Sequence, residues 1–246
     1  MSDFHYGDAM TRNVFVLTGA GISAESGLGT FRDTDGAWAR FDPMRLATPE
    51  GFAADPVLVH DFYNHRRRDA RAAAPNPAHT ALARLEAGLA ERGGRLFLCT
   101  QNIDDLHERA GSRHVVHMHG ELLRARCTAC GAEPVWHEDL TVETACPHCA
   151  RGGEMRPDVV WFGEMPKHLD AIDEALAEAD LFVAIGTSGA VYPAAGYVAQ
   201  ARAFGIPTLA LTLDEADNAG MFEASRLGRA SETVPALVDE VLGEAA

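Results

Sequence analysis

Four cysteines in two close pairs constrain the fold of this chain more than any other feature. The pairs are Cys127-x-x-Cys130 and Cys146-x-x-Cys149, with fifteen residues between them. Two such pairs can complete a tetrahedral four-thiolate zinc site. Because four thiolates leave no coordination position for water or substrate, we expect one structural Zn²⁺ ion and a reaction centre elsewhere. His148 is a weaker candidate ligand, and two disulfides are the alternative interpretation.

The composition is that of an ordinary soluble globular protein. The 246 residues are 47% hydrophobic and 23% charged, which excludes the disordered and fibrous classes. The net charge of −15 argues against non-specific binding to nucleic acid and suits a basic partner, such as a lysine-bearing protein segment. The sequence shows neither a signal peptide nor a membrane span, so we expect a cytoplasmic protein without membrane partners. Cys99 lies in an apolar run and is expected to be a buried core thiol.

Short β-prone apolar runs alternate with longer stretches of helical periodicity, which predicts a parallel sheet covered by helices on both faces. The predicted strands are 14–17, 96–100, 115–118, 181–185 and 208–213. The predicted helices, several with proline in the first turn, are 56–71, 77–92, 166–179, 193–204 and 234–244. The cysteine segment, about 127–151, interrupts this alternation. We therefore expect an α/β protein with two lobes.

The first predicted strand runs directly into a glycine-rich turn. Residues 19–24, Gly-Ala-Gly-Ile-Ser-Ala, match the G-x-G-x-x-G/A pattern of dinucleotide-binding turns, in which glycines let the backbone approach a pyrophosphate. The acidic residue that usually follows about twenty positions later is not evident, because Asp42 lies in a proline-containing stretch. This disfavours an ordinary hydride-transfer enzyme. A tight turn of purely structural use is the alternative interpretation.

Longer motifs make the whole sequence similar to one family. In chain order they are 19–27 with Phe31 and Arg32, 100–104, His119-Gly120, the four cysteines, Pro157 with 159–164, and 186–188. The series resembles the sirtuins, NAD-dependent protein-lysine deacylases, over about residues 14–241. The resemblance implies NAD as co-substrate, acylated-lysine proteins as substrates, and a large Rossmann-like lobe joined to a smaller zinc-ribbon and helical lobe. It places the large lobe at about 10–35, 75–122 and 155–246, and the small lobe at about 36–74 and 123–154.

The sirtuin reaction explains why these residue types are needed. In that reaction the acyl-lysine oxygen attacks the C1′ carbon of the nicotinamide ribose, nicotinamide leaves, and an imidate-linked intermediate forms. Acyl transfer to the ribose then releases free lysine. The second stage needs a base near neutral pH, which suits imidazole. His119 matches the family's catalytic histidine; His117 alternates onto the same strand face, whereas His107 and His114 are expected at the surface or in packing roles.

The resemblance also implies which residues hold the nicotinamide end of NAD. Gln101, Asn102 and Asp104 are expected to contact the ribose and the nicotinamide, with Asp104 holding the carboxamide. Amide side chains can bond neutral hydroxyl groups without placing a charge beside them. The resemblance also implies that Asn102 belongs to the catalytic centre with His119. A helix N-cap is an alternative role for residues 102–104, and both roles can hold together.

Other segments are expected to enclose the rest of the cofactor. Phe31 and Arg32 would close over the ribose, and 186–188 would bind the adenosine end. Thr212 stands where the family often has asparagine. The complete predicted NAD-binding set is Gly19, Ala20, Gly21, Ser23, Ala24, Glu25, Phe31, Arg32, Trp38, Gln101, Asn102, Ile103, Asp104, Gly186, Thr187, Ser188, Thr212, Leu213, Asp214 and Ala230.

Two residues of the predicted helix 56–71 are candidates for determining which acyl groups the protein removes. Tyr63 and Arg66 are three positions apart and so share a helix face, where a phenol and a guanidinium can hold a carboxylate. They resemble the tyrosine and arginine of the sirtuin subclass that removes succinyl and malonyl groups. A solvated basic face formed by 66–68 is the alternative. An extended substrate backbone is expected to pair with Val160, Trp161, Phe162 and Gly163.

The combined interpretation is a deacylase that removes acetyl and acidic acyl groups. Its predicted products are nicotinamide, O-acyl-ADP-ribose and free lysine. Two alternatives are a protein mono-ADP-ribosyltransferase and a non-catalytic module that binds NAD or ADP-ribose. The combination of His119, Asn102 and Asp104 disfavours the non-catalytic module.

Overall fold

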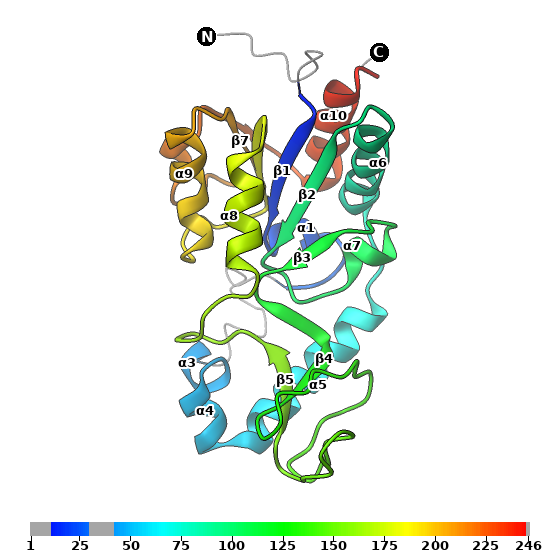
Figure 1. Cartoon of the computed structure of the whole chain (residues 1–246), viewed down its shortest axis with the longest axis vertical. Helices are drawn as coiled ribbons and strands as arrows, with labels where there is room; N and C mark the ends of the chain where they lie inside the picture. The colour runs from blue at the N-terminus through cyan, green and yellow to red at the C-terminus, as the bar shows by residue number, and fades with distance from the viewer. Residues whose placement is uncertain (1–10, 30–41, 245–246) are drawn as a thin grey trace.

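A six-stranded, fully parallel sheet forms the centre of the protein (Figure 1). The computed structural model describes residues 11–29 and 42–244. The strands in the sheet are β1 (Asn13–Thr18), β2 (Arg95–Thr100), β3 (Val115–His117), β6 (Leu181–Ile185), β7 (Thr208–Thr212) and β8 (Ala224–Leu227). Their spatial order is β3-β2-β1-β6-β7-β8. Renumbered within the sheet, this is the 3-2-1-4-5-6 order of the Rossmann fold, which confirms the predicted fold class.

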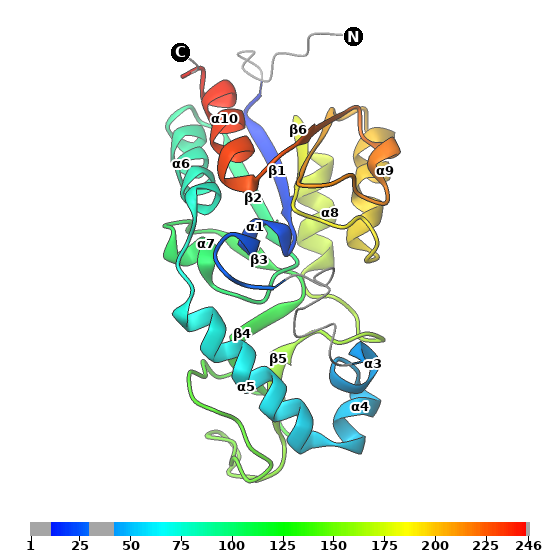
Figure 2. The ribbon, with the colours of Figure 1, turned by 180° about the vertical axis from the view of Figure 1, so that it is seen from behind.

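Helices cover both faces of the sheet, as Figures 1 and 2 show. They are α6 (Pro77–Glu91) and α10 (Ala230–Leu242) on one face, and α8 (Leu169–Ala177) and α9 (Tyr197–Ala203) on the other. Strand β1 explains this arrangement. Val14 and Val16 pack in the core with α6 and α10, whereas Phe15 and Leu17 pack in the core with α8 and α9. Successive side chains of a strand point to opposite faces of the sheet. A strand that is apolar at every position therefore has apolar side chains on both faces, and both faces are buried.

A second group of helices and strands forms a smaller part below the sheet in Figure 1. They are α3 (Pro43–Leu46), α4 (Pro49–Ala54), α5 (Pro56–Ala72), β4 (Gly120–Cys127) and β5 (Met155–Val159). Strands β4 and β5 form an antiparallel pair, and residues 128–154 between them carry three of the four cysteines. A separate core joins α5 to this pair through Phe62, Leu122 and Trp161. This part is the predicted zinc-ribbon and helical domain; its boundaries along the chain stay a prediction.

Short helical turns complete the fold: α1 (Gly21–Ala24), α7 (Leu106–Arg109), η1 (Ala194–Gly196) and η2 (Ala219–Met221). The helix predicted at 166–179 begins later, at Leu169, because His168 has a φ of 62°, outside the helical region. The helix predicted at 234–244 begins earlier, at Ala230, where an acidic side chain from the glycine-rich segment bonds its first turn. Within the described residues, no helix combines the length and the apolarity that a membrane span needs.

Strand β8 was missing from the sequence prediction. Its four residues, Ala-Ser-Arg-Leu, alternate between half-buried and exposed positions and include no run of large apolar side chains. An edge strand of a parallel sheet is covered less than the central strands, so its sequence carries a weaker hydrophobic pattern.

Candidate functional site

The predicted NAD-binding segments converge at the carboxyl edge of the sheet. Strands β1, β2, β3, β6 and β7 all end there because the sheet is fully parallel. Ligands of open parallel sheets bind at this edge, where the strand order reverses. In this chain the reversal lies between β1 and β6. The topology therefore gathers five segments that are distant in sequence around one position.

The glycine-rich turn after β1 packs directly on the segment after β6. The N–H groups of Gly19 and Gly21 donate to the carbonyl oxygens of Ile185 and Gly186, at 2.9 Å each. A Cβ atom on Gly21 would lie 2.7 Å from the Cα of Gly186, and one on Gly19 would lie 2.8 Å from the Gly186 oxygen. Gly186 itself has a φ of 61°. The glycines are thus required by a close backbone contact, so a structural role is present whatever they do toward a pyrophosphate.

Three of the predicted cofactor residues form a buried hydrogen-bonded cluster. The Asn102 Nδ2 group donates to the Ser23 Oγ atom and to the Gly19 carbonyl oxygen, at 3.2 Å each. Ser23 Oγ in turn donates to Asp104 Oδ2 at 3.2 Å. Burial raises the pKa of the Asp104 carboxyl group. Asp104 Oδ1 also accepts the N–H of Leu106 at 3.2 Å, so this residue supports the start of α7 as well.

A buried pair of histidines packs against this cluster, a contact that no local pattern in the sequence indicates. His79 Nε2 lies 3.4 Å from Ser23 Oγ, and its ring centre lies 4.9 Å from that of His107. His107 Nε2 contacts Thr18 Oγ1 at 3.0 Å, and this hydroxyl donates to Thr100 Oγ1 at 2.8 Å. Burial lowers the pKa of both histidines, that of His79 to about 4, so both are neutral at neutral pH. His107 was expected at the surface or in a packing role, and the structure buries it in a packing role.

His119 lies just beyond β3 at the same edge. Its Nδ1 atom is 3.1 Å from the carbonyl oxygen of Gln101. A carbonyl oxygen only accepts, so Nδ1 carries the proton and Nε2 is unprotonated in the neutral ring. Burial lowers the pKa of His119, against a smaller opposing effect of the Gln101 hydrogen bond. A neutral imidazole with one unprotonated nitrogen is the form of histidine that acts as a general base.

His117, two residues earlier, lies in the opposite environment. Its Nδ1 and Nε2 atoms contact two acceptors, the Asn102 carbonyl oxygen at 3.2 Å and the Glu108 carboxylate at 2.8 Å. Burial lowers the pKa of His117, but its bond to the Glu108 carboxylate more than offsets this, so the pKa is raised. A ring that donates from both nitrogens has no lone pair for a proton. The hydrogen bonds therefore distinguish His119 from His117 as a base. His114 is exposed, as expected.

Tyr63 and Trp161, predicted to bind substrate, meet in the smaller part of the protein. Trp161 Nε1 donates to the Tyr63 hydroxyl oxygen at 2.9 Å, and both side chains are buried. Because this oxygen accepts the indole bond, its own proton remains for a further acceptor. Burial raises the pKa of Tyr63, so the hydroxyl group stays protonated at neutral pH. The pair thus holds a phenol donor in a fixed position.

Arg67 and Arg68 have different environments although they are adjacent in α5. Arg67 is buried: its Nε atom donates to the Leu122 carbonyl oxygen at 2.9 Å, and its Nη1 atom donates to Asn64 Oδ1 at 2.8 Å. Burial lowers its pKa to about 10. Arg68 is exposed and pairs with Asp139 at 2.6 Å. Of these two, only Arg68 fits a solvated basic face.

Arg66 is half-buried, and its guanidinium makes no hydrogen bond or ion pair with any residue of 11–29 or 42–244. Burial lowers the pKa of Arg66, while the negative charges of Asp69 and Asp104 oppose this shift, as does the neighbouring Tyr63. The guanidinium therefore lies within electrostatic reach of both the Asp104 cluster and the phenol. A guanidinium in this setting can donate hydrogen bonds to the carboxylate of a ligand.

The predicted substrate run, 160–163, begins directly after β5. The N–H groups of Val160 and Phe162 already donate to the carbonyl oxygens of His119 and Ala47, at 2.8 Å each. An added substrate strand would therefore pair through other backbone groups of the run. The Phe162 side chain is 43% exposed and offers an apolar contact at the surface.

The other predicted cofactor residues lie at the same edge or outside the described part. Glu25 accepts the N–H and Oγ groups of Ser231 at 3.0 and 2.6 Å, and so holds the first turn of α10, where Ala230 lies. The segments after β2 and β6 carry the half-buried Gln101, Ile103, Thr187 and Ser188. The end of β7 carries a buried Thr212 and an exposed Leu213 and Asp214. Outside the described residues lie Phe31, Arg32 and Trp38.

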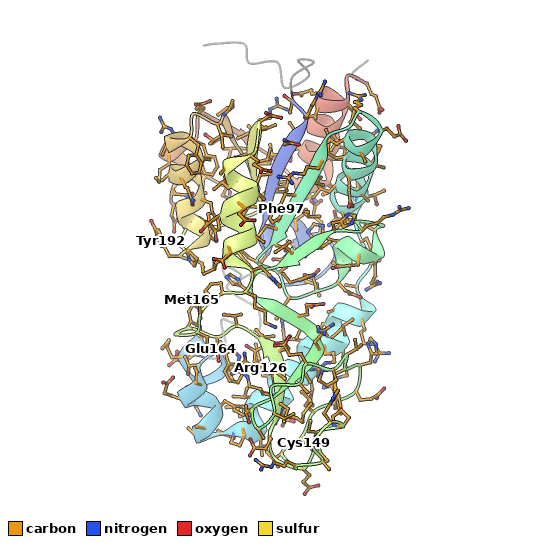
Figure 3. The ribbon with its side chains drawn as sticks, in the orientation of Figure 1. Phe97, Arg126, Cys149, Glu164, Met165 and Tyr192 are labelled. Carbon is orange, nitrogen blue, oxygen red and sulfur yellow. The ribbon has the colours of Figure 1, made fainter. Side chains whose placement is uncertain are left out.

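The four predicted metal ligands lie together in the smaller part, and Figure 3 places Cys149 far from the sheet. The sulfur atoms all lie within 4.8 Å of one another, and the Cys127–Cys149 and Cys130–Cys146 sulfur pairs are each 3.7 Å apart. Four sulfurs at about 2.3 Å from one zinc ion are separated by about 3.8 Å, so the cluster fits Zn²⁺. All four cysteines are free, which does not support the disulfide alternative.

Loss of zinc is expected to destabilise the smaller part of the protein. Cys127→Ala and Cys146→Ala each remove a buried thiolate, and structural zinc sites contribute directly to folding. We expect elemental analysis to find one zinc per wild-type chain and substoichiometric zinc in both variants, with a lower melting temperature. Cys99→Ala, a buried thiol outside the cluster, should keep its zinc and serves as the control. A wild-type protein without bound zinc would contradict the four-thiolate assignment.

Comparison with known proteins agrees with a dinucleotide-binding α/β protein that carries a zinc ribbon. The Sir2 family profile matches residues 19–193. A protein of Caulobacter vibrioides named NAD-dependent protein deacylase is 60% identical over 231 residues, which are 93% of this chain and 96% of that protein. The NAD-dependent protein deacylase SIR2rp3 of Leishmania major is 52% identical over 236 residues, 95% and 97% of the two chains. The crystal structure of a Sir2 homologue with NAD has a TM-score of 0.87 at 39% identity, covering 96% and 91%. The chain belongs to the Sir2 family.

Proposed function

We propose that the protein is an NAD-dependent protein-lysine deacylase that removes acetyl and acidic acyl groups. The observation that carries the proposal is the 3.1 Å contact between His119 Nδ1 and the Gln101 carbonyl oxygen, from which we infer that the ring proton is on Nδ1. This leaves Nε2 as a base at the sheet edge where the cofactor segments meet. Relatives named NAD-dependent protein deacylase support the reaction class. A Sir2 structure with a deacetylated peptide and an acetyl ADP-ribose, TM-score 0.78 at 28% identity, supports a protein substrate.

The chain's own groups have separate tasks in this reaction. NAD, when bound, supplies the ribose carbon and hydroxyl groups that receive the acyl group. The turn at 19–21 is proposed to approach the pyrophosphate. Ser23, Asn102 and Asp104, which hydrogen bonds hold in place, are proposed to orient the nicotinamide end. His119 Nε2 is proposed to take a proton from a ribose hydroxyl group. The neutral state of His119, favoured by burial, supports this step.

Tyr63 and Arg66 are proposed to select acyl groups that end in a carboxylate. The phenol proton and the guanidinium lie on one face of α5, and neither is used by another group of the described chain. Arginine matches a carboxylate through paired N–H donors, and the phenol adds one more. Succinyl and malonyl groups carry this carboxylate, whereas an acetyl group ends in a methyl group. We therefore propose faster turnover of the acidic acyl groups, with deacetylation retained.

Product analysis tests this function. Purified protein is incubated with NAD and matched succinyl, malonyl and acetyl peptides, and the products are separated and identified by mass spectrometry. We expect free lysine peptide, nicotinamide and O-acyl-ADP-ribose in equal amounts. ADP-ribose retained on protein would indicate a mono-ADP-ribosyltransferase instead. Absence of nicotinamide release would indicate a binding module.

The pH dependence of turnover is expected to follow His119. The base must be neutral, so activity is lost as the pH falls through the pKa of His119 in the folded protein. Because burial lowers this pKa from its ordinary value of 6.5, the acidic limb of kcat should have a midpoint below 6.5. Rates measured between about pH 5 and 8, with circular dichroism as a check on folding, provide the test. A midpoint at or above 6.5 would contradict the neutral-base assignment.

A further inference from the structure

Lys167 is the single lysine in a chain that has twenty arginines. It lies between the substrate run 160–163 and α8, just after Glu164 and Met165, which Figure 3 labels. Its Nζ atom is 2.8 and 2.7 Å from the two carboxylate oxygens of Asp158, and 3.2 Å from Glu133 Oε2. Asp158 belongs to β5, and Glu133 belongs to the cysteine-bearing loop. One ammonium group therefore joins two elements of the smaller part.

Asp158 depends on this ammonium group. Its side chain is 2% exposed, and within 11–29 and 42–244 its carboxylate bonds to no group other than Lys167. A buried carboxylate is strongly unfavourable without a charged or hydrogen-bonded partner. Removal of the lysine charge would therefore drive Asp158 toward water and displace the strand that carries it.

The same lysine also bonds the backbone beside His119. The Lys167 N–H group donates to the Met118 carbonyl oxygen at 2.9 Å, and the Val160 N–H group donates to the His119 carbonyl oxygen at 2.8 Å. Gly120 packs so closely on β5 that a Cβ atom there would lie 2.1 Å from the Asp158 carbonyl oxygen. Residues 118–120 are thus held against β5, and Lys167 contacts both this segment, through its backbone, and β5, through its ion pair with Asp158.

We propose that Lys167 is a positioning residue for His119, acting through Asp158 and the backbone of residues 118–120. The inference rests on the proposed deacylase function. It predicts a defect in the stage that needs the base, because a base displaced by about 1 Å can lose about a hundredfold in rate. The earlier stage, in which nicotinamide leaves, uses no base and should be affected much less.

Two assays separate these stages. Exchange of labelled nicotinamide into NAD, in the presence of acylated peptide, reports the first stage, and release of free lysine peptide reports both. For Lys167→Met we expect deacylation to fall about tenfold to a hundredfold, with exchange within about threefold of wild type. Lys167→Arg keeps the positive charge and should restore most of the deacylation. The double variant Lys167→Met/Asp158→Asn should be less impaired than Lys167→Met, because no buried charge is left unpaired.

Arg68→Met is the matched control, because it breaks an ion pair whose two side chains are 54% and 51% exposed, on the solvent side of α5. It should leave both assays unchanged. If Lys167→Met does not fold, Asp158→Asn keeps the shape of the site and should show the same stage-selective loss at a smaller size. An unchanged ratio of deacylation to exchange in the folded Lys167 and Asp158 variants would overturn the inference. Wild-type protein that releases no nicotinamide would instead overturn the proposed function.

Discussion

Replacement of His119 by alanine is expected to lower the rate of deacylation about a hundred- to ten-thousand-fold, the usual effect of removing a general base. The fold and NAD binding should remain, because the side chain is half-buried at the sheet edge and its ring bonds only to the Gln101 carbonyl oxygen among the described groups. The measurements are kcat on an acylated peptide, thermal unfolding, and NAD affinity by calorimetry.

His117→Gln is the control for this experiment. His117 lies two residues earlier and is bonded through both nitrogens to Asn102 and Glu108, so it has no lone pair for a proton. We expect a smaller loss of activity from this change, together with a lower melting temperature, since the Glu108 bond is lost. Near-wild-type turnover by the His119 variant would remove His119 from the proposed mechanism.

Arg66→Met is expected to lower kcat/KM on succinyl-lysine far more than on acetyl-lysine. Truncating one side of a buried charged pair costs about 2 to 5 kcal/mol, which corresponds to a loss of about thirty- to several-thousand-fold. An acetyl group carries no carboxylate, so it loses no charged partner. The measurement is the ratio of kcat/KM values on matched succinyl and acetyl peptides. Arg68→Met, on the same helix but exposed and paired with Asp139, should leave this ratio unchanged.

Tyr63→Phe should shift the same ratio by a smaller factor. This change also leaves the buried Trp161 N–H group without its acceptor, so both acyl substrates will share some loss of activity. The ratio is therefore the informative quantity. Equal losses on both acyl groups in the Arg66 variant would mean that Arg66 supports the helix or the cofactor segment, and the acidic-acyl preference would then be withdrawn.

The central strands and the metal ligands were predictable because their signals are local. The run Val14 to Leu17 is apolar at every position, which indicates a strand buried on both faces, and the structure buries its side chains in the cores on both faces of the sheet. The spacing of the four cysteines similarly fixes which sulfur atoms can meet on one ion. Neither inference needs knowledge of a distant part of the chain.

Contacts between distant segments were not predictable in this way. Sequence shows three consecutive arginines in α5, but the burial of Arg67 is decided by the Leu122 carbonyl oxygen on β4. The Tyr63–Trp161 hydrogen bond joins residues 98 positions apart. The Lys167–Asp158 pair depends on a turn after β5 that carries no pattern of its own. These contacts are properties of the packed chain, and they set the finer chemistry of the site.

The ion pair of Lys167 has a consequence for the protein's exposure to reactive metabolites. Acyl thioesters and acyl phosphates modify unprotonated amines, and arginine guanidinium groups stay protonated and do not react in this way. The chain offers these donors one side-chain amine, and three carboxylate oxygens within 3.2 Å of its Nζ atom restrict their approach to it. If the proposed function holds, conditions that load other proteins with acyl groups should leave this enzyme almost unmodified, and it would keep working when its substrates are most abundant.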